Sequence, residues 1–265
     1  MANKRSVKSV VREKLSRLLA RPGGMSTPVS MLNDWQERGW RPILFGGFVR
    51  DIAILGRRYY PRDVDVVLIN ASTEDIMREF HPQSYHLNRF GGLRLDFHRW
   101  AFDVWPLEKT WAFTVDTSLA PIVENLPKTT FLDVEAVAVT LREQGKIERI
   151  YAHGFFEAVD RGCIGIGYRE NPFPALCAIR AMIIACKLRY KVSSGVARYF
   201  VQAVREHGAS ELVNAQDIHY KRVLFRKPDI SILRTHFTKA LDEDGAEEIS
   251  LPDIYDPVQL NLWHD

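Results

Sequence analysis

Residues 42–68 read PILFGGFVRDIAILGRRYYPRDVDVVL, in which apolar runs alternate with sharp breaks. The apolar run 43–45 predicts a short buried strand. Gly46 and Gly47 follow it and allow a sharp turn close to a ligand, because neither residue carries a Cβ atom. Apolar residues at helical spacing then predict a helix over 48–55. This part of the chain is therefore predicted to form a strand, a tight turn and a helix.

Two carboxylates stand where the next strand begins. Asp63 and Asp65 precede the β-branched run 66–69, which predicts a strand, so both side chains should lie on one face. Adjacent carboxylates repel each other unless a cation lies between them. Mg²⁺ suits such a pair because it prefers hard oxygen ligands and completes its shell with water and phosphates. A lone Asp-x-Asp is also typical of a solvated strand start, so the spacing alone leaves both interpretations open.

The turn before the helix adds a second feature. Free amides and the positive dipole end at a helix N-terminus suit a phosphate group. A phosphate cradle and a carboxylate pair close together in sequence predict phosphoryl or nucleotidyl transfer. An Asp-x-Asp pair also occurs in metal-dependent glycosyltransferases, but there it usually follows a complete nucleotide-binding α/β unit.

The ordered combination resembles the head domain of the bacterial-type (class II) CCA-adding enzymes and poly(A) polymerases, in the DNA polymerase β nucleotidyltransferase superfamily. The family motif is Gly-Gly-x-Val-Arg-Asp, an apolar helix ending in Leu-Gly-Arg, and Asp-x-Asp. This chain carries GGFVRD at 46–51, LGR at 55–57 and DVD at 63–65. The resemblance, which covers roughly 41–192, implies an α+β fold. It implies a mixed sheet flanked by helices, followed by a small helical neck-like domain.

The resemblance implies a third acidic residue. After a Phe-Gly pair the family has a strand with an acid followed by valine, and Asp103 matches that acid. Asp63, Asp65 and Asp103 would then be catalytic and would hold Mg²⁺ or Mn²⁺, because two metal ions roughly 3.5–4 Å apart need more ligands than one carboxylate pair supplies. Asp96 and Asp116 are competing third ligands that match the pattern less well. The alternative for Asp103 is an exposed acid on an edge strand.

The resemblance also implies a nucleotide-binding set at the turn. The amides of Gly46 and Gly47 would cradle the phosphates of an NTP, and Arg50 would add positive charge. Asp51 would position either that arginine or a ribose.

A second part of the nucleotide site is implied further along the chain. The family helix Asp-Pro-x-Arg-x-x-Arg-Ala-x-Arg is represented here by the segment 171–181, NPFPALCAIRA. Pro174 and Cys177 stand where the first two arginines are expected, and Arg180 alone remains as a nucleotide-binding candidate. Because proline and cysteine cannot replace a bidentate guanidinium, triphosphate binding by this helix should be weakened or altered.

The chain of 265 residues is predicted to have three parts. These are a basic N-terminal helix within 1–24, a head domain over 25–168, and a helical neck-like domain with an acidic tail over 169–265. The basic face of the first helix would contact RNA phosphates or simply face solvent. Serines at 193 and 194 predict the start of a helix that runs to residue 206. The family's base-selecting Glu-Asp-x-x-Arg helix is not found in the shortened C-terminal part.

Composition fits an ordinary folded chain, with 46% hydrophobic and 26% charged residues and a net charge of +3. The charge is compatible with RNA binding but too small to demonstrate it. Cys163, Cys177 and Cys186 lie in apolar settings at no metal-type spacing, which predicts reduced thiols and a cytoplasmic location. No run is long enough to span a membrane.

The predicted function is metal-dependent transfer of a nucleoside monophosphate from an NTP to an acceptor hydroxyl at an RNA 3′ end, such as that of tRNA. Two alternatives stay open. A protein side chain or a small molecule could be the acceptor, as in a toxin or defence factor. A head domain without activity could instead serve as an RNA-binding partner.

Overall fold

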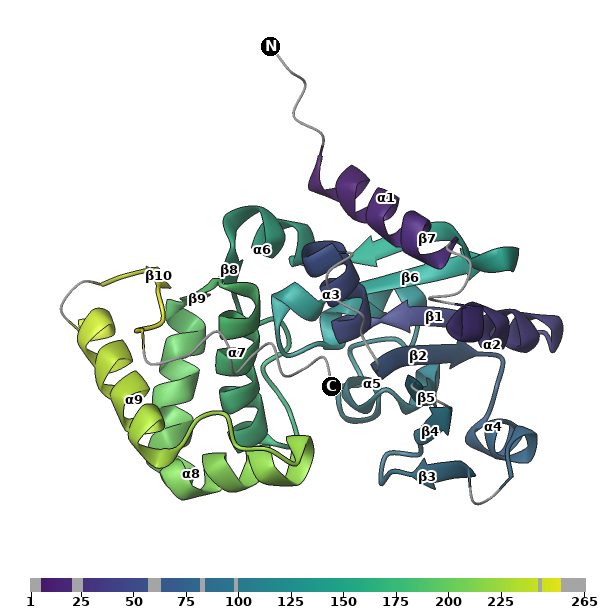
Figure 1. Ribbon diagram of the computed structural model, residues 1–265. Helices are drawn as coiled ribbons and strands as arrows, with labels where there is room; N and C mark the ends of the chain where they lie inside the picture. Colours follow the sequence, from purple (N-terminus) through teal and green to yellow (C-terminus); the bar gives the residue numbers. More distant parts are fainter. Residues whose placement is uncertain are drawn as a thin grey trace, which may run out of the picture. The chain divides into compact units, whose positions relative to one another are not determined.

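The computed structural model describes residues 6–20, 26–56, 63–81, 84–97, 100–242 and 245–253 (Figure 1). The chain divides into two compact units. The first unit comprises 1–130 and 134–156, and the second comprises 131–133 and 157–265. This division falls earlier than the predicted boundary at residue 168, and the N-terminal helix belongs to the first unit.

A seven-stranded mixed sheet forms the centre of the first unit, in the order β3-β4-β5-β2-β1-β6-β7. Only the β2–β5 pair is parallel, and the other five neighbouring pairs are antiparallel. The sheet confirms the predicted α+β class and its mixed character. The strands are β1 Arg41–Phe45, β2 Asp63–Ile69, β3 Tyr85–Leu87, β4 Leu93–Phe97, β5 Trp100–Pro106, β6 Val137–Arg142 and β7 Lys146–Ala152.

The helices of the first unit begin and end close to their sequence signals. Helix α3 starts directly at Gly46, two residues earlier than predicted, and ends before Gly56, whose φ of 63° suits a glycine C-cap. Ser72 caps α4 in a capping box with Asp75. The helices are α1 Val7–Leu19, α2 Ser26–Glu37, α3 Gly46–Leu55, α4 Thr73–Glu79 and α5 Trp111–Val115.

The central strands have one apolar face and one mixed face. Val64 and Phe102 are fully buried, and Trp35 of α2 packs edge-on against Phe102 with ring centroids 6.2 Å apart. On the opposite face Val67 joins a buried cluster with Leu126 from the 3-10 segment Val123–Thr129. The residues that alternate with Val64 on β2 therefore share the face of that cluster.

Two basic side chains of α1 fasten it to the first unit. Arg12 Nη2 donates to the carbonyl oxygen of Ile147 in β7 at 3.0 Å. Lys14 Nζ donates to the carbonyl oxygen of Ala53, near the C-terminus of α3, at 2.7 Å. A cation at that end of a helix is favourable because its last carbonyls lack helical partners. These contacts give part of the basic face a structural role, whereas its contact with RNA stays a prediction.

The second unit combines three packed helices with a small sheet. Helix α7 packs against α8, and α8 packs against α9. The sheet, in the order β10-β9-β8, was not predicted, and its strand β10 comes from the segment expected to be an acidic tail. The elements are α6 Phe155–Arg161, which begins in the first unit, β8 Cys163–Ile164, α7 Pro174–Leu188, β9 Lys191–Ser193, α8 Ser194–Tyr220, α9 Lys227–Asp242 and β10 Glu248–Ile249.

Helix α8 has two segments, and the first ends close to the predicted residue 206. Ser193 caps it, and its only break is at Gly208, with φ 78° and ψ 155°. None of the described helices has the length and apolar character needed to cross a bilayer.

The three cysteines are free thiols, and burial raises the pKa of Cys163 to about 11 and that of Cys186 to about 12, so both stay protonated at neutral pH.

A buried glutamine holds the connection between α8 and α9. Gln216 is fully buried, and its Oε1 accepts from the amides of Leu224 and Phe225 at 3.0 and 2.9 Å. Its Nε2 donates to the carbonyl of Phe225 at 2.9 Å. We expect Gln216→Met to lower the free energy of unfolding by about 1–3 kcal/mol, because it leaves buried backbone groups without partners. Urea denaturation beside exposed Gln202→Met tests this, and equal stability of the two variants contradicts it.

Candidate metal and nucleotide site

Parallel pairing of β2 with β5 brings the predicted carboxylates together. Asp65 lies directly beside Asp103, and Asp63 lies beside Ala101. Because side chains alternate along a strand, and Val64 and Phe102 face the buried side, all three carboxylates lie on the other face. Asp63 is 66% exposed and Asp103 is 36% exposed, so solvent reaches this end of the strands. The structure thus places the three residues on the same face of two neighbouring strands, and their role as metal ligands stays a prediction.

The glycine turn lies against the same carboxylates. Gly46 has a φ of 60°, and a Cβ atom built there would lie 3.6 Å from Asp65 Oδ2. Residues with a side chain rarely adopt this conformation, which explains the glycine. Gly46 itself is buried, and Gly47 is partly exposed. Phe45 is the N-cap residue of α3, and its side chain has no hydrogen-bond acceptor. The Phe45 side chain therefore does not bind the first backbone amides of the helix, where a phosphate would bind.

A buried group of charges follows the turn. Arg50 Nε donates to Asp51 Oδ1 at 2.8 Å, and Arg50 Nη1 donates to Glu135. Arg50 and Asp51 are each 4% exposed, and Glu135 is 7% exposed. The guanidinium predicted to add charge for the nucleotide therefore faces two carboxylates in this structure. Of the two roles predicted for Asp51, positioning Arg50 agrees with the observed ion pair.

Arg94 supplies the positive charge among the three carboxylates. It lies opposite Asp103 in the β4–β5 pairing. Its Nη1 donates to Asp103 Oδ2 at 2.9 Å, and its Nη2 donates to Asp63 Oδ1 at 2.8 Å. Within the described parts of the chain, no three acidic, histidine or cysteine side chains converge closely enough to hold a metal ion in this conformation. The donors are hard carboxylate oxygens and fit Mg²⁺ chemically, but Arg94 lies across two of them.

The electrostatics of the site follow from partial burial and close charges. Burial raises the pKa of Asp103, which the nearby Arg94 opposes and the charge of Asp63 reinforces, with a net increase. Burial lowers the pKa of Arg94, but Asp103 and Asp63 outweigh this effect and leave it raised. The guanidinium is therefore always charged, and the pKa of Asp103 is raised mainly because burial disfavours its charged form.

The two competing third ligands occupy different positions. Asp96 is 64% exposed, and its Oδ1 lies 3.8 Å from Arg94 Nε, at the edge of the site. Asp116 accepts from the amide of Ser118 at 3.0 Å and closes a turn after α5. Asp103, which lies directly beside Asp65 in the β2–β5 pairing, is thus the best placed of the three candidates for a third metal ligand.

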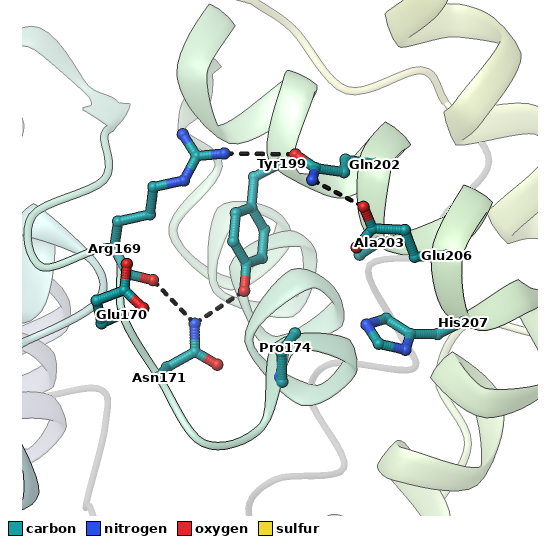
Figure 2. A pocket seen from close by; sticks show the side chains of 9 residues that line it. All are labelled: Arg169, Glu170, Asn171, Pro174, Tyr199, Gln202, Ala203, Glu206 and His207. Atoms are coloured by element: carbon teal, nitrogen blue, oxygen red, sulfur yellow. Dashed lines mark hydrogen bonds between the residues drawn. The ribbon is translucent and has the colours of Figure 1, made fainter.

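Arg180, the remaining nucleotide-binding candidate, lies on α7 in the second unit and is partly buried. The same unit has a hollow of about 190 Å³ between the segment before α7 and the side of α8, shown in Figure 2. Asn171 Nδ2 donates to the Tyr199 hydroxyl at 2.8 Å at one side of this hollow, and Pro174 lines it. Arg180 is not among its lining residues, and its nucleotide contact stays a prediction.

No protein-family model and no curated protein sequence matches the chain. Solved structures do match it. A CCA-adding enzyme with CTP superposes with a TM-score of 0.59 at 17% identity, covering 89% of this chain and 56% of that one. The Thermotoga maritima CCA-adding enzyme complexed with tRNA gives 0.56 at 15% identity, covering 89% and 55%. A tRNA nucleotidyltransferase with a primer tRNA and an incoming ATP analogue gives 0.52 at 18%, covering 79% and 60%.

These matches show that the chain has the fold of CCA-adding enzymes in their head and neck region, which confirms the predicted resemblance. The chain spans somewhat more than half the length of those proteins. At identities below one fifth, the likeness shows the fold alone.

Proposed function

We propose that this chain is a metal-dependent nucleotidyltransferase that moves a nucleoside monophosphate from an NTP to an acceptor hydroxyl. The observation that carries the proposal is the register that puts Asp65 beside Asp103, with the Gly46 turn against the Asp65 carboxylate. Asp63 and Asp103 are accessible to solvent and, with Asp65, lie close to the N-terminus of α3, which suits a phosphate group. The shared fold with CCA-adding enzymes supports the same reaction class.

Each residue of the site has a role in this proposal. Asp63, Asp65 and Asp103 would hold Mg²⁺ or Mn²⁺, which supplies activation of the attacking hydroxyl and neutralisation of the leaving pyrophosphate. The turn at Gly46 and Gly47 lets the triphosphate approach the backbone, because no side chain intervenes. The buried ion pairs of Arg50 with Asp51 and Glu135 fix the start of α3, where the phosphates would bind.

The proposed acceptor is an RNA 3′ end, such as that of tRNA. Two of the matching structures hold tRNA, and the chain carries a net charge of +3. Transfer to a protein or a small molecule is the second candidate, because Pro174 and Cys177 alter the predicted neck helix. A non-catalytic RNA-binding head domain is the third, and the guanidinium seated on Asp63 and Asp103 favours it.

Transfer of label distinguishes these candidates. Wild-type protein is incubated with Mg²⁺, total RNA, a protein extract and each α-labelled NTP in turn, and RNA, protein and small products are separated. We expect label in RNA, with 3′-end sequencing showing added nucleotides. Label in protein or in a small product selects the second acceptor class. An absence of label in every fraction with all four NTPs contradicts nucleotidyl transfer.

A further inference from the structure

Arg94 connects two carboxylates from different strands through different nitrogens. Nη1 donates to Asp103 on β5, and Nη2 donates to Asp63 on β2, at 2.9 and 2.8 Å. Nε completes the contact set at 3.8 Å from Asp96. Asp63 and Asp103 are two of the three carboxylates that the proposed function assigns to a divalent cation, and the guanidinium already occupies one oxygen of each, Asp63 Oδ1 and Asp103 Oδ2.

A guanidinium and a metal ion compete for these two carboxylates. Arginine is not deprotonated in proteins, so it cannot become neutral to make room for a second cation. Two positive charges held a few ångströms apart repel each other strongly at a partly buried site. Arg94 and the divalent cation are therefore alternative partners of Asp63 and Asp103.

The side chain of Arg94 can leave without disturbing the strand. Leu93 and Leu95 on either side are 1% and 2% exposed and anchor β4 on the opposite face. The Arg94 side chain is 42% exposed, and it ends at the open end of the acidic face. Its movement therefore requires rotation of side-chain bonds and no rearrangement of the sheet.

A released guanidinium needs a new anion, and an NTP brings one. The planar fork that now binds two carboxylates matches phosphate oxygens equally well. We propose that Arg94 exchanges partners, an inference that rests on the proposed function. Arg94 neutralises Asp63 and Asp103 in the empty site, and it binds the triphosphate once a metal–nucleotide complex enters. Arg94 is thereby a nucleotide-binding residue that also sets the metal concentration at which the site fills.

Arg94→Gln separates the two halves of this exchange. In a titration with Mn²⁺ alone, followed by electron paramagnetic resonance, we expect this variant to bind Mn²⁺ about tenfold more tightly than wild type, a coupling of ordinary size, because the competing charge is gone. In a calorimetric titration at saturating Mn²⁺ with the α,β-methylene analogues of ATP and CTP, we expect its affinity to fall about tenfold, because a charge-assisted contact is lost. Opposite changes in the two affinities are the signature of exchange.

Two further variants make the result decisive. Arg94→Lys keeps the charge without the fork, so its Mn²⁺ affinity should stay near that of wild type while analogue affinity falls. Arg78→Gln removes an exposed arginine of α4 from the same unit and should change neither affinity. If Arg94→Gln weakens both affinities or changes neither, partner exchange is wrong although the proposed function stands. If wild-type protein binds neither Mn²⁺ nor the analogues, the proposed function fails first.

Discussion

An Asp65→Asn variant should transfer nucleotide at least about 1,000-fold more slowly than wild type, because loss of a metal ligand removes several kcal/mol of transition-state stabilisation. The effect should be this large because Asp65 occupies the central position of the site. It lies beside Asp103 on the neighbouring strand and against the turn at Gly46. Asparagine keeps the shape of the side chain and removes only the charge, so the variant tests the chemistry. The measurement is the rate of label transfer from the preferred α-labelled NTP under single-turnover conditions.

The control for this variant removes an acid from another part of the same unit. Glu74 lies exposed in the first turn of α4, and Glu74→Gln should leave the transfer rate unchanged. Thermal unfolding without metal shows whether Asp65→Asn is folded. A folded Asp65→Asn protein that transfers label as fast as Glu74→Gln contradicts the assignment of Asp65.

Of all the substitutions proposed, Arg50→Met should lower the free energy of unfolding most, because it breaks the buried ion pairs of Arg50 with Asp51 and Glu135. Arg50→Met leaves Asp51 and Glu135 buried without their guanidinium, and removal of one partner from a buried ion pair costs about 3–5 kcal/mol. Methionine fills most of the volume, so the cost comes mainly from uncompensated charge. The measurement is the free energy of unfolding from urea denaturation at neutral pH.

A double variant isolates the cause of that loss. Adding Glu135→Gln to Arg50→Met removes one of the two carboxylates that have lost the guanidinium. This second substitution should therefore recover part of the lost free energy of unfolding. Arg78→Met breaks an exposed ion pair with Asp75 and should cause no measurable loss. If Arg50→Met is as stable as Arg78→Met, the buried group does not hold the turn.

Local sequence was sufficient for the elements around the turn. The Gly46–Gly47 pair fixes the start of α3, and alternation along β2 puts Asp63 and Asp65 on one face, because both features depend on a few neighbouring residues. Asp103 could be named only from the family resemblance, since its place beside Asp65 depends on β5 pairing parallel to β2.

The residues that sequence reasoning missed owe their roles to distant partners. Arg94 faces the carboxylates because β4 pairs with β5. In the sequence it is marked only by its place between two apolar residues, Leu93 and Leu95, which does not identify the carboxylates that it contacts. Glu135 contacts Arg50, which lies 85 positions earlier in the chain. The small sheet of the second unit has strands of two or three residues, which are too short to show an alternating pattern.

The most direct test is a crystal structure of the protein grown with Mn²⁺ and α,β-methylene-ATP, with anomalous scattering recorded to locate the metal. We predict a Mn²⁺ peak in contact with the carboxylates of Asp65 and Asp103, the triphosphate at the Gly46–Gly47 turn, and Arg94 withdrawn from Asp63. A crystal that contains the nucleotide elsewhere, with no Mn²⁺ peak at these carboxylates and Arg94 still bound to them, contradicts a metal-dependent nucleotidyltransferase site in this chain.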